Sequence, residues 1–172
     1  HPESAATGER TDASIPWTVI RDVDSSKEDD VCFTTEAFCG VLSETALDAE
    51  SPADFLRKAV AFCNDSVWGT LSSCLLIHPK SLKDPEVQEA YNEALDNLKY
   101  GTIGVNHWPA LGYGLVTPTW GAHPGHPLTD IQSGRGSVHN TYMFSKPQKS
   151  VVIGPFTMFP KPAWFVTNKK TQ

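Results

Sequence analysis

Two helical segments that open with a proline, each followed by a short apolar run, constrain the fold of this chain most. Ser51-Pro52 begins the first segment and Asp84-Pro85 the second, and in each a capping side chain precedes a proline at the first helical position. Strand-like runs follow at residues 71–77 and 102–108. Because a helix between two strands makes a crossover connection, the sequence predicts an α/β fold with a small, mainly parallel sheet and flanking helices.

The remaining segments divide the chain into three parts. Residues 1–14 are small and polar, which predicts a flexible N-terminal arm. Residues 15–140 hold the main portion, with further strands expected at 15–20 and 31–42, and Gly101 is expected to end the second helix in the left-handed conformation. Residues 141–172 carry strand-like runs at 142–144 and 150–153 among several prolines, which favours an edge strand or an extended C-terminal arm.

The acidic composition and the apolar pattern argue against several classes of partner. The 172 residues have a formal net charge of -6, which disfavours nucleic acid. No apolar run approaches the roughly 20 residues of a bilayer span, and no signal-like segment opens the sequence, so we expect no membrane association and a cytoplasmic location. None of the four cysteines forms a C-x-x-C pair, and we expect structural thiols rather than disulfides or metal ligands.

One segment resembles a motif of a known family. Glu36-Ala37-Phe38-Cys39-Gly40-Val41-Leu42 is similar to the Glu-x-Phe-Gly-Pro-Val motif of NAD(P)-dependent aldehyde dehydrogenases, although Cys39 and Gly40 replace the family's Gly-Pro. The segments 15–23, 59–71 and 98–106 resemble three further blocks of that family, in the family's order. The resemblance covers the chain from about Ile15 to Val152 and implies the C-terminal part of the catalytic region.

The resemblance also implies roles for four residues. In the family the motif's Glu holds the nicotinamide ribose hydroxyls and its Phe packs near the nicotinamide, which are the roles implied for Glu36 and Phe38. Asn106 would border the substrate channel, as would Trp120, whose Pro-Thr-Trp-Gly segment is similar to the family's Pro-Phe-Gly-Gly. Plainer interpretations stay open: Glu36 as a surface carboxylate beside a core Phe38, and Asn106 as a cap of its strand end.

The family's chemistry needs groups that this sequence does not supply. There, a cysteine nucleophile in a Gly-Gln-x-Cys turn precedes the Glu-x-Phe motif, and here neither that turn nor a G-x-G-x-x-G turn is found. Cys32 and Cys39 lie in no activating environment, so no catalytic residue is assigned. The parent enzyme would oxidise an aldehyde to a carboxylic acid with NAD or NADP through a cysteine thioester. The chain alone is expected to be inactive and to bind neither cofactor tightly.

Two other functions remain open. The segment from His139 to Val152 resembles the family's closing segment, in which a C-terminal strand leaves the body and pairs with a neighbouring subunit. A homo-oligomer is therefore expected, and a non-catalytic oligomerisation or partner-binding module is the first alternative. The second alternative is a self-contained hydrolase that pairs one of the six histidines with a cysteine. His123 and His126 are not expected to form a metal site, because prolines follow both and no cysteine or carboxylate pair lies nearby.

Overall fold

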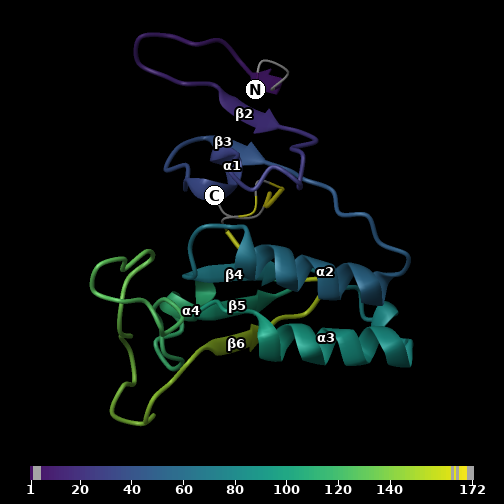
Figure 1. Ribbon diagram of the computed structural model, residues 1–172, viewed down its shortest axis with the longest axis vertical. Coiled ribbons are helices and arrows are strands. Elements are labelled where there is room, and N and C mark those ends of the chain that lie inside the picture. Colours follow the sequence, from purple (N-terminus) through teal and green to yellow (C-terminus); the bar gives the residue numbers. More distant parts are fainter. Residues whose placement is uncertain (2–4, 164, 166, 170–172) are drawn as a thin grey trace. The chain divides into compact units, whose positions relative to one another are not determined.

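The chain divides into two compact units in a computed structural model, which describes residues 1, 5–163, 165 and 167–169. Unit 1 comprises His1–Gly69 and Glu89–Leu98, and unit 2 comprises Thr70–Gln88 and Lys99–Gln172. Figure 1 labels the elements of both units. The structure is mixed α/β, as predicted, but it contains two small sheets where the sequence predicted one.

The sheet of unit 1 has three short strands. β1 (Ala5–Thr7) pairs antiparallel with β2 (Trp17–Ile20), and β2 pairs parallel with β3 (Val41–Ser43). The strand predicted at 15–20 is therefore confirmed. The segment 1–14, in contrast, contributes a strand to the sheet, where only an arm was expected.

The strand predicted across residues 31–42 is wrong over most of its length. Residues Val31–Thr34 form a short helix, α1, and the chain returns to extended pairing only at Val41. Asp30 explains the difference, because its carboxylate accepts a 2.9 Å hydrogen bond from the N–H of Cys32 and so caps a helical turn. Phe33 then points inward and packs edge-on against Phe62, with ring centroids 5.1 Å apart.

Both predicted helices form where their caps place them. α2 spans Pro52–Asp65, and the Ser51 hydroxyl accepts a 3.1 Å hydrogen bond from the N–H of Asp54. α3 spans Pro85–Asn97. Within unit 1, α2 runs alongside the second half of α3 (Figure 1). Arg57 pairs with Glu93 at 2.7 Å, and the amide of Asn64 donates to the carbonyl of Asn97, so polar contacts join the two helices at their surface.

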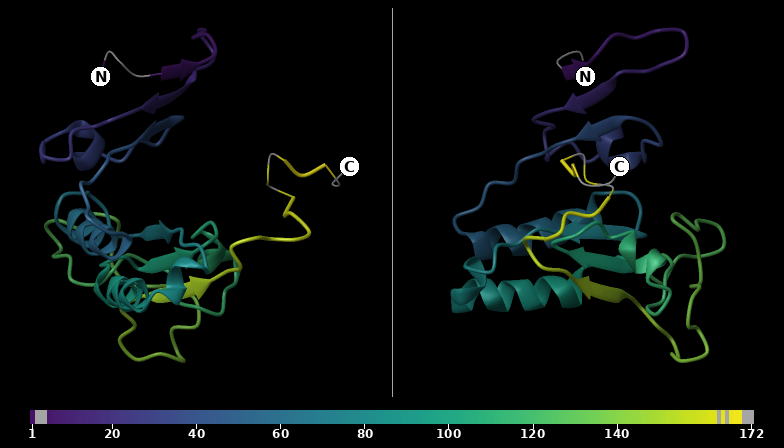
Figure 2. Two further views of the ribbon diagram at one scale, coloured as in Figure 1. Left: turned by 90° about the vertical axis from the view of Figure 1, so that its right-hand side faces the viewer. Right: turned by 180° about the vertical axis from the view of Figure 1, so that it is seen from behind.

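The sheet of unit 2 is wholly parallel, with the strand order β4-β5-β6. β4 is Ser72–Leu75, β5 is Thr102–Val105 and β6 is Ser150–Ile153. Between β4 and β5 the chain passes through a short 3-10 helix, η1 (Ser81–Lys83), and α3. Between β5 and β6 it passes through α4 (Leu111–Gly114) and a long loop that Figure 2 shows from two further sides. The predicted crossover connections and parallel sheet are thus confirmed, with β5 buried at the centre.

Two further expectations need correction. Gly101 does not take the left-handed conformation; instead it follows α3 at a point where a side chain would overlap the carbonyl oxygen of Gly121. Residues 142 and 143 lie in a turn and residue 144 lies outside any strand, whereas β6 pairs with β5 at the edge of its sheet, so the edge strand expected at 150–153 is confirmed. None of the helices in the described part of the chain combines the length and apolar character that a membrane span requires.

Candidate functional site

Glu36 and Phe38 lie together in unit 1, in the loop that joins α1 to β3. Both side chains are exposed, and Phe38 retains 90% of its accessible surface. Among the described residues, no group bonds the Glu36 carboxylate, so both of its oxygens remain available as acceptors. The interpretation of Phe38 as a core residue is therefore wrong. The exposure of Glu36 fits a surface carboxylate as well as it fits a ribose-binding carboxylate.

Phe38 is one of three exposed large apolar side chains on β2, on β3 and in the loop before β3, and we call Trp17, Phe38 and Leu42 the exposed apolar patch. Trp17 begins β2 and is 78% exposed, and Leu42 lies in β3 and is 66% exposed. The two strands pair in parallel, and the Trp17 ring lies beside Gly40 in the approach to β3. Scattered apolar side chains are normal on a surface, but three large ones within one small sheet and its adjoining loop are compatible with a region that another segment covers.

Asn106 follows β5 in unit 2, at the carboxyl end of the parallel sheet. Its backbone has a positive φ of 61°, and its side-chain oxygen accepts a 2.8 Å hydrogen bond from the N–H of Ile77, which follows β4. Asn tolerates this conformation better than most residues do. The side chain therefore joins the ends of two neighbouring strands, which gives Asn106 a structural role through Ile77 rather than through its own backbone.

Trp120 lies at the other end of β5. Its ring packs edge-on against Tyr113 at 5.7 Å, and its backbone bridges to Val138. Gly112 lies between Trp120 and Thr102, the first residue of β5. Because a strand rises about 3.3 Å per residue, the structure does not bring Trp120 and Asn106 into one pocket wall.

His107 is a buried side chain that the sequence analysis did not single out. Its Nε2 lies 2.6 Å from the carbonyl oxygen of Val152 in β6, and its Nδ1 lies 2.8 Å from that of Trp108. A neutral imidazole carries one N–H, so both contacts are hydrogen bonds only when the ring is protonated. Since both nitrogens face carbonyl oxygens, His107 is not placed to act as a general base or a metal ligand.

Cysteine–histidine pairing, which the hydrolase alternative requires, fails around His107. The thiol of Cys74 donates to the His107 carbonyl at 3.2 Å and does not contact its ring. Burial raises the pKa of Cys74, against a smaller lowering by that hydrogen bond. Cys74 therefore stays a thiol and lacks a base.

A second cysteine–histidine contact lies in unit 1. Cys32 Sγ lies 3.6 Å from Nε2 of His1, and the same nitrogen lies 3.1 Å from Asp30 Oδ1. A catalytic relay needs the carboxylate on the opposite ring nitrogen, and burial together with Asp30 raises the pKa of Cys32, so this is no activated nucleophile. The three atoms lie within 4.8 Å of one another, as metal ligands would, but Asp30 Oδ1 already caps α1.

The histidines of the long loop hold it to Thr70, two residues before β4. His126 Nε2 lies 2.8 Å from the hydroxyl of Thr70, and the Ser133 hydroxyl accepts from the N–H of Thr70 at 2.9 Å. The Thr70 carbonyl accepts from the N–H of His123. These contacts anchor the loop beside the amino end of the sheet. Sequence reasoning missed them because they join residues far apart in the chain.

No protein-family model, no curated protein and no solved structure matches this chain. A functional assignment therefore depends on its residues and their geometry.

Proposed function

We propose that this chain is the C-terminal part of the catalytic region of an NAD(P)-dependent aldehyde dehydrogenase. In the complete enzyme, Glu36 would bind the nicotinamide ribose and Phe38 would pack near the nicotinamide. Asn106 and Trp120 would each border the substrate channel at a different point. The sequence blocks that resemble the family, in the family's order, support this proposal. The small parallel sheet with its helical crossover is compatible with it.

The exposed apolar patch of Trp17, Phe38 and Leu42 is the observation that carries the proposal. A phenylalanine with 90% of its surface in water contributes nothing to the core of its own unit. Its position two residues from an unbonded carboxylate is what a site for a nucleotide would need. The carboxylate can accept hydrogen bonds from two ribose hydroxyls, and the apolar ring can cover a flat heterocycle.

The residues of this chain would bind and orient the cofactor and would not themselves react with the aldehyde. When bound, NAD or NADP would supply the acceptor for the hydride that leaves the aldehyde. Glu36 would fix the ribose, and Phe38 would exclude water from one side of the nicotinamide. The nucleophile and most of the cofactor contacts would come from segments outside these residues.

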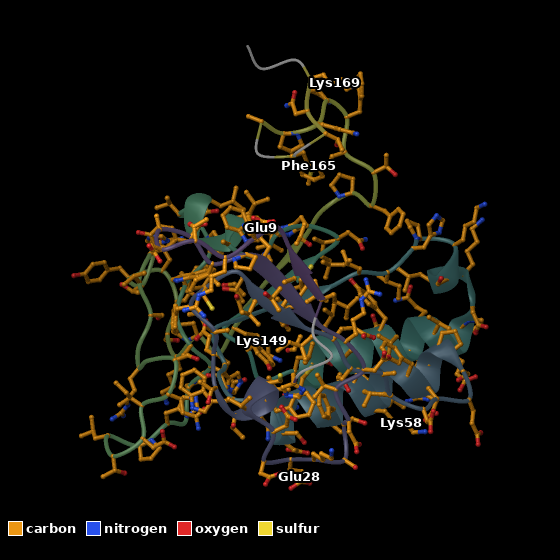
Figure 3. All side chains as sticks on the ribbon, turned by 90° about the horizontal axis from the view of Figure 1, so that it is seen from above. Glu9, Glu28, Lys58, Lys149, Phe165 and Lys169 are labelled. Carbon is orange, nitrogen blue, oxygen red and sulfur yellow. The ribbon has the colours of Figure 1, made fainter. Side chains whose placement is uncertain are left out.

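Substitution of Glu36 in the longest protein that its gene encodes tests this role. Glu36→Gln should weaken NAD binding about 10- to 100-fold, because a charge-assisted pair of hydrogen bonds is lost. Glu28→Gln is the matched control, since Glu28 is an exposed carboxylate of the same unit (Figure 3). The measurements are the Kd of NAD by calorimetry and aldehyde-dependent NAD reduction.

Three outcomes would contradict the proposal. The first is a longest protein that reduces neither NAD nor NADP with any of a panel of aldehydes. The second is an equal effect of the substitutions at Glu36 and Glu28. The third is tight NAD binding by residues 1–172 alone, which would mean that the cofactor site is complete without any other segment.

The open edge of β6 favours a second candidate, a non-catalytic oligomerisation module. β6 ends the strand order of its sheet, so one side of its backbone has no partner strand among the described residues. An edge of this kind can pair with a second chain. A longest protein that forms stable oligomers but never reduces NAD would favour this module over the enzyme.

A further inference from the structure

Unit 2 carries a positive charge that the acidic composition of the whole chain hides. Its sequence contains nine lysines and arginines against three aspartates and glutamates, a formal charge of +6, whereas the chain as a whole has -6. Unit 1 carries the balance, with five basic and seventeen acidic residues, or -12. A unit with this excess of cations attracts anions from solution.

A pocket of about 200 Å³ lies within unit 2, at the amino ends of β5 and β6. Its walls include Gly101, Gly121, Gly136 and Lys149, and the described residues that line it include no aspartate or glutamate. A side chain on Gly101 would overlap the carbonyl oxygen of Gly121, and one on Gly121 would overlap that of Gly136. Backbone therefore forms much of the wall, and Lys149 is the one formally charged residue among those that line it.

Parallel pairing brings a second lysine to the same edge of the sheet. Lys99 precedes β5 and Lys149 precedes β6, and the N–H of Ser150 bonds the carbonyl of Gly101 at 2.9 Å, so the two approaches to the sheet run together. Lys149 is labelled in Figure 3. His123 and His126 belong to the loop that covers this edge, where both are tied to Thr70.

The surroundings of His123 at this end of the sheet are positively charged. Burial lowers the pKa of His123, and the positive charges of Lys149, Lys99 and His126 lower it further, against an opposing hydrogen bond to the Pro124 carbonyl. An anion bound in the pocket beside Lys149 would be attracted by this positively charged surrounding.

We propose that this pocket binds a compact oxyanion, the phosphate or carboxylate group of a small molecule, with Lys149 as its principal cation. The volume is below the roughly 300–1,000 Å³ of sites for drug-sized ligands, which suits a single anionic group. The pocket adjoins a larger one of about 500 Å³ through Thr119, Pro147 and Lys149, and Met143, Phe144 and Val151 line that neighbour. The rest of a ligand would have room there. This site does not depend on the aldehyde dehydrogenase proposal, since Glu36 and Phe38 belong to the other unit.

Anion titrations of the full chain test the site. Inorganic phosphate and acetate would each be titrated by calorimetry at constant ionic strength, with chloride as the balancing anion, because simple screening then stays fixed. We expect saturable binding with one site per chain, and phosphate tighter than acetate because it carries more charge. Binding of acetate alone would still support the site and would identify the ligand group as a carboxylate.

Three substitutions separate the pocket from the general charge of the unit. Lys149→Met should weaken phosphate binding by about tenfold or more, since it removes the charge-assisted contact and keeps the side chain's length. Lys149→Arg should retain binding. Lys146→Met is the matched control, because Lys146 is an exposed lysine of the same connection that lies outside the pocket lining, and it should change binding less than about twofold.

Unfolding curves of each variant would confirm that the fold is intact. The proposal is overturned if neither anion binds saturably to the parent chain, or if the substitutions at Lys146 and Lys149 weaken binding equally.

Discussion

His107 holds the carboxyl ends of two strands through one ring. His107 follows β5, its side chain reaches the carbonyl of Val152 in β6, and it is only 8% exposed. Two glycines make room for it: a Cβ on Gly154 would lie 2.9 Å from the ring's Cδ2, and one on Gly104 would lie 3.2 Å from Cε1. The sequence could not reveal this arrangement, because Gly104 lies in β5 and Gly154 follows β6, and the two come close to one ring only when the sheet forms.

Substitution of His107 should therefore destabilise unit 2. His107→Ala leaves a buried carbonyl without its imidazole partner and opens a cavity, and we expect a loss of about 2–4 kcal/mol in the free energy of unfolding. His78→Ala provides the control, because His78 is exposed and its ring lies against the exposed ring of Phe156 and accepts one hydrogen bond, at 3.0 Å from the N–H of Lys80. It should cost less than about 1 kcal/mol. Urea unfolding would measure the free energy of unfolding of both variants. Equal losses would contradict a stabilising contact between His107 and the Val152 carbonyl.

Among the elements, those that the sequence predicted correctly carry their signals within a few residues. α2 begins where Ser51 caps it and Pro52 starts it, and β4 and β5 follow from short apolar runs. The segment 31–42 was mispredicted because its apolar and β-branched residues suggest a strand, whereas one carboxylate, Asp30, stabilises a helical turn at its start. The sequence predicted that Gly101 ends a helix in the left-handed conformation. In the structure a glycine is needed there because the Gly121 carbonyl lies too close for a side chain.

The loop between β5 and β6 packs on the sheet through glycine backbone, and this contact can be tested. Gly101→Ala would place a methyl group against the Gly121 carbonyl, which neither backbone can avoid without moving. We expect a loss of about 1–3 kcal/mol or more from overpacking. Gly114→Ala is the control, because Gly114 lies in α4, lacks a positive φ and has no atom within 4 Å of the added carbon. Thermal unfolding should show a lower Tm for Gly101→Ala and an unchanged Tm for Gly114→Ala. An unchanged Tm for Gly101→Ala would contradict the close packing of Gly101 against Gly121.

At the scale of the whole molecule, the net charge conceals that one unit is acidic and the other is basic. The net charge of -6 argued against nucleic acid, yet it is the sum of an acidic unit, His1–Gly69 with Glu89–Leu98, and a basic unit that comprises the rest of the chain. The absence of a nucleic-acid partner stays a prediction for that reason. The four site residues suggested by the family resemblance are likewise divided, two in each unit, and the sequence could not indicate that Asn106 and Trp120 lie at opposite ends of one strand.

Self-association through β6 is the prediction that depends on the chain as a whole. Along β6, the N–H groups of Ser150 and Gly154 bond to the β5 side, so those of Val151 and Ile153 point to the open edge. If a second copy pairs with this edge, Ile153→Pro should abolish the oligomer, because it removes one outward donor and leaves the bonds to β5 in place. Ile153→Thr keeps the donor and should preserve the oligomer, although the side chain changes. Sedimentation velocity over a range of concentrations would measure the assembly. An edge strand can pair with a partner strand only through the backbone groups that it leaves unpaired. The interface is therefore not β6 if the parent chain stays monomeric, or if Ile153→Pro assembles as well as Ile153→Thr.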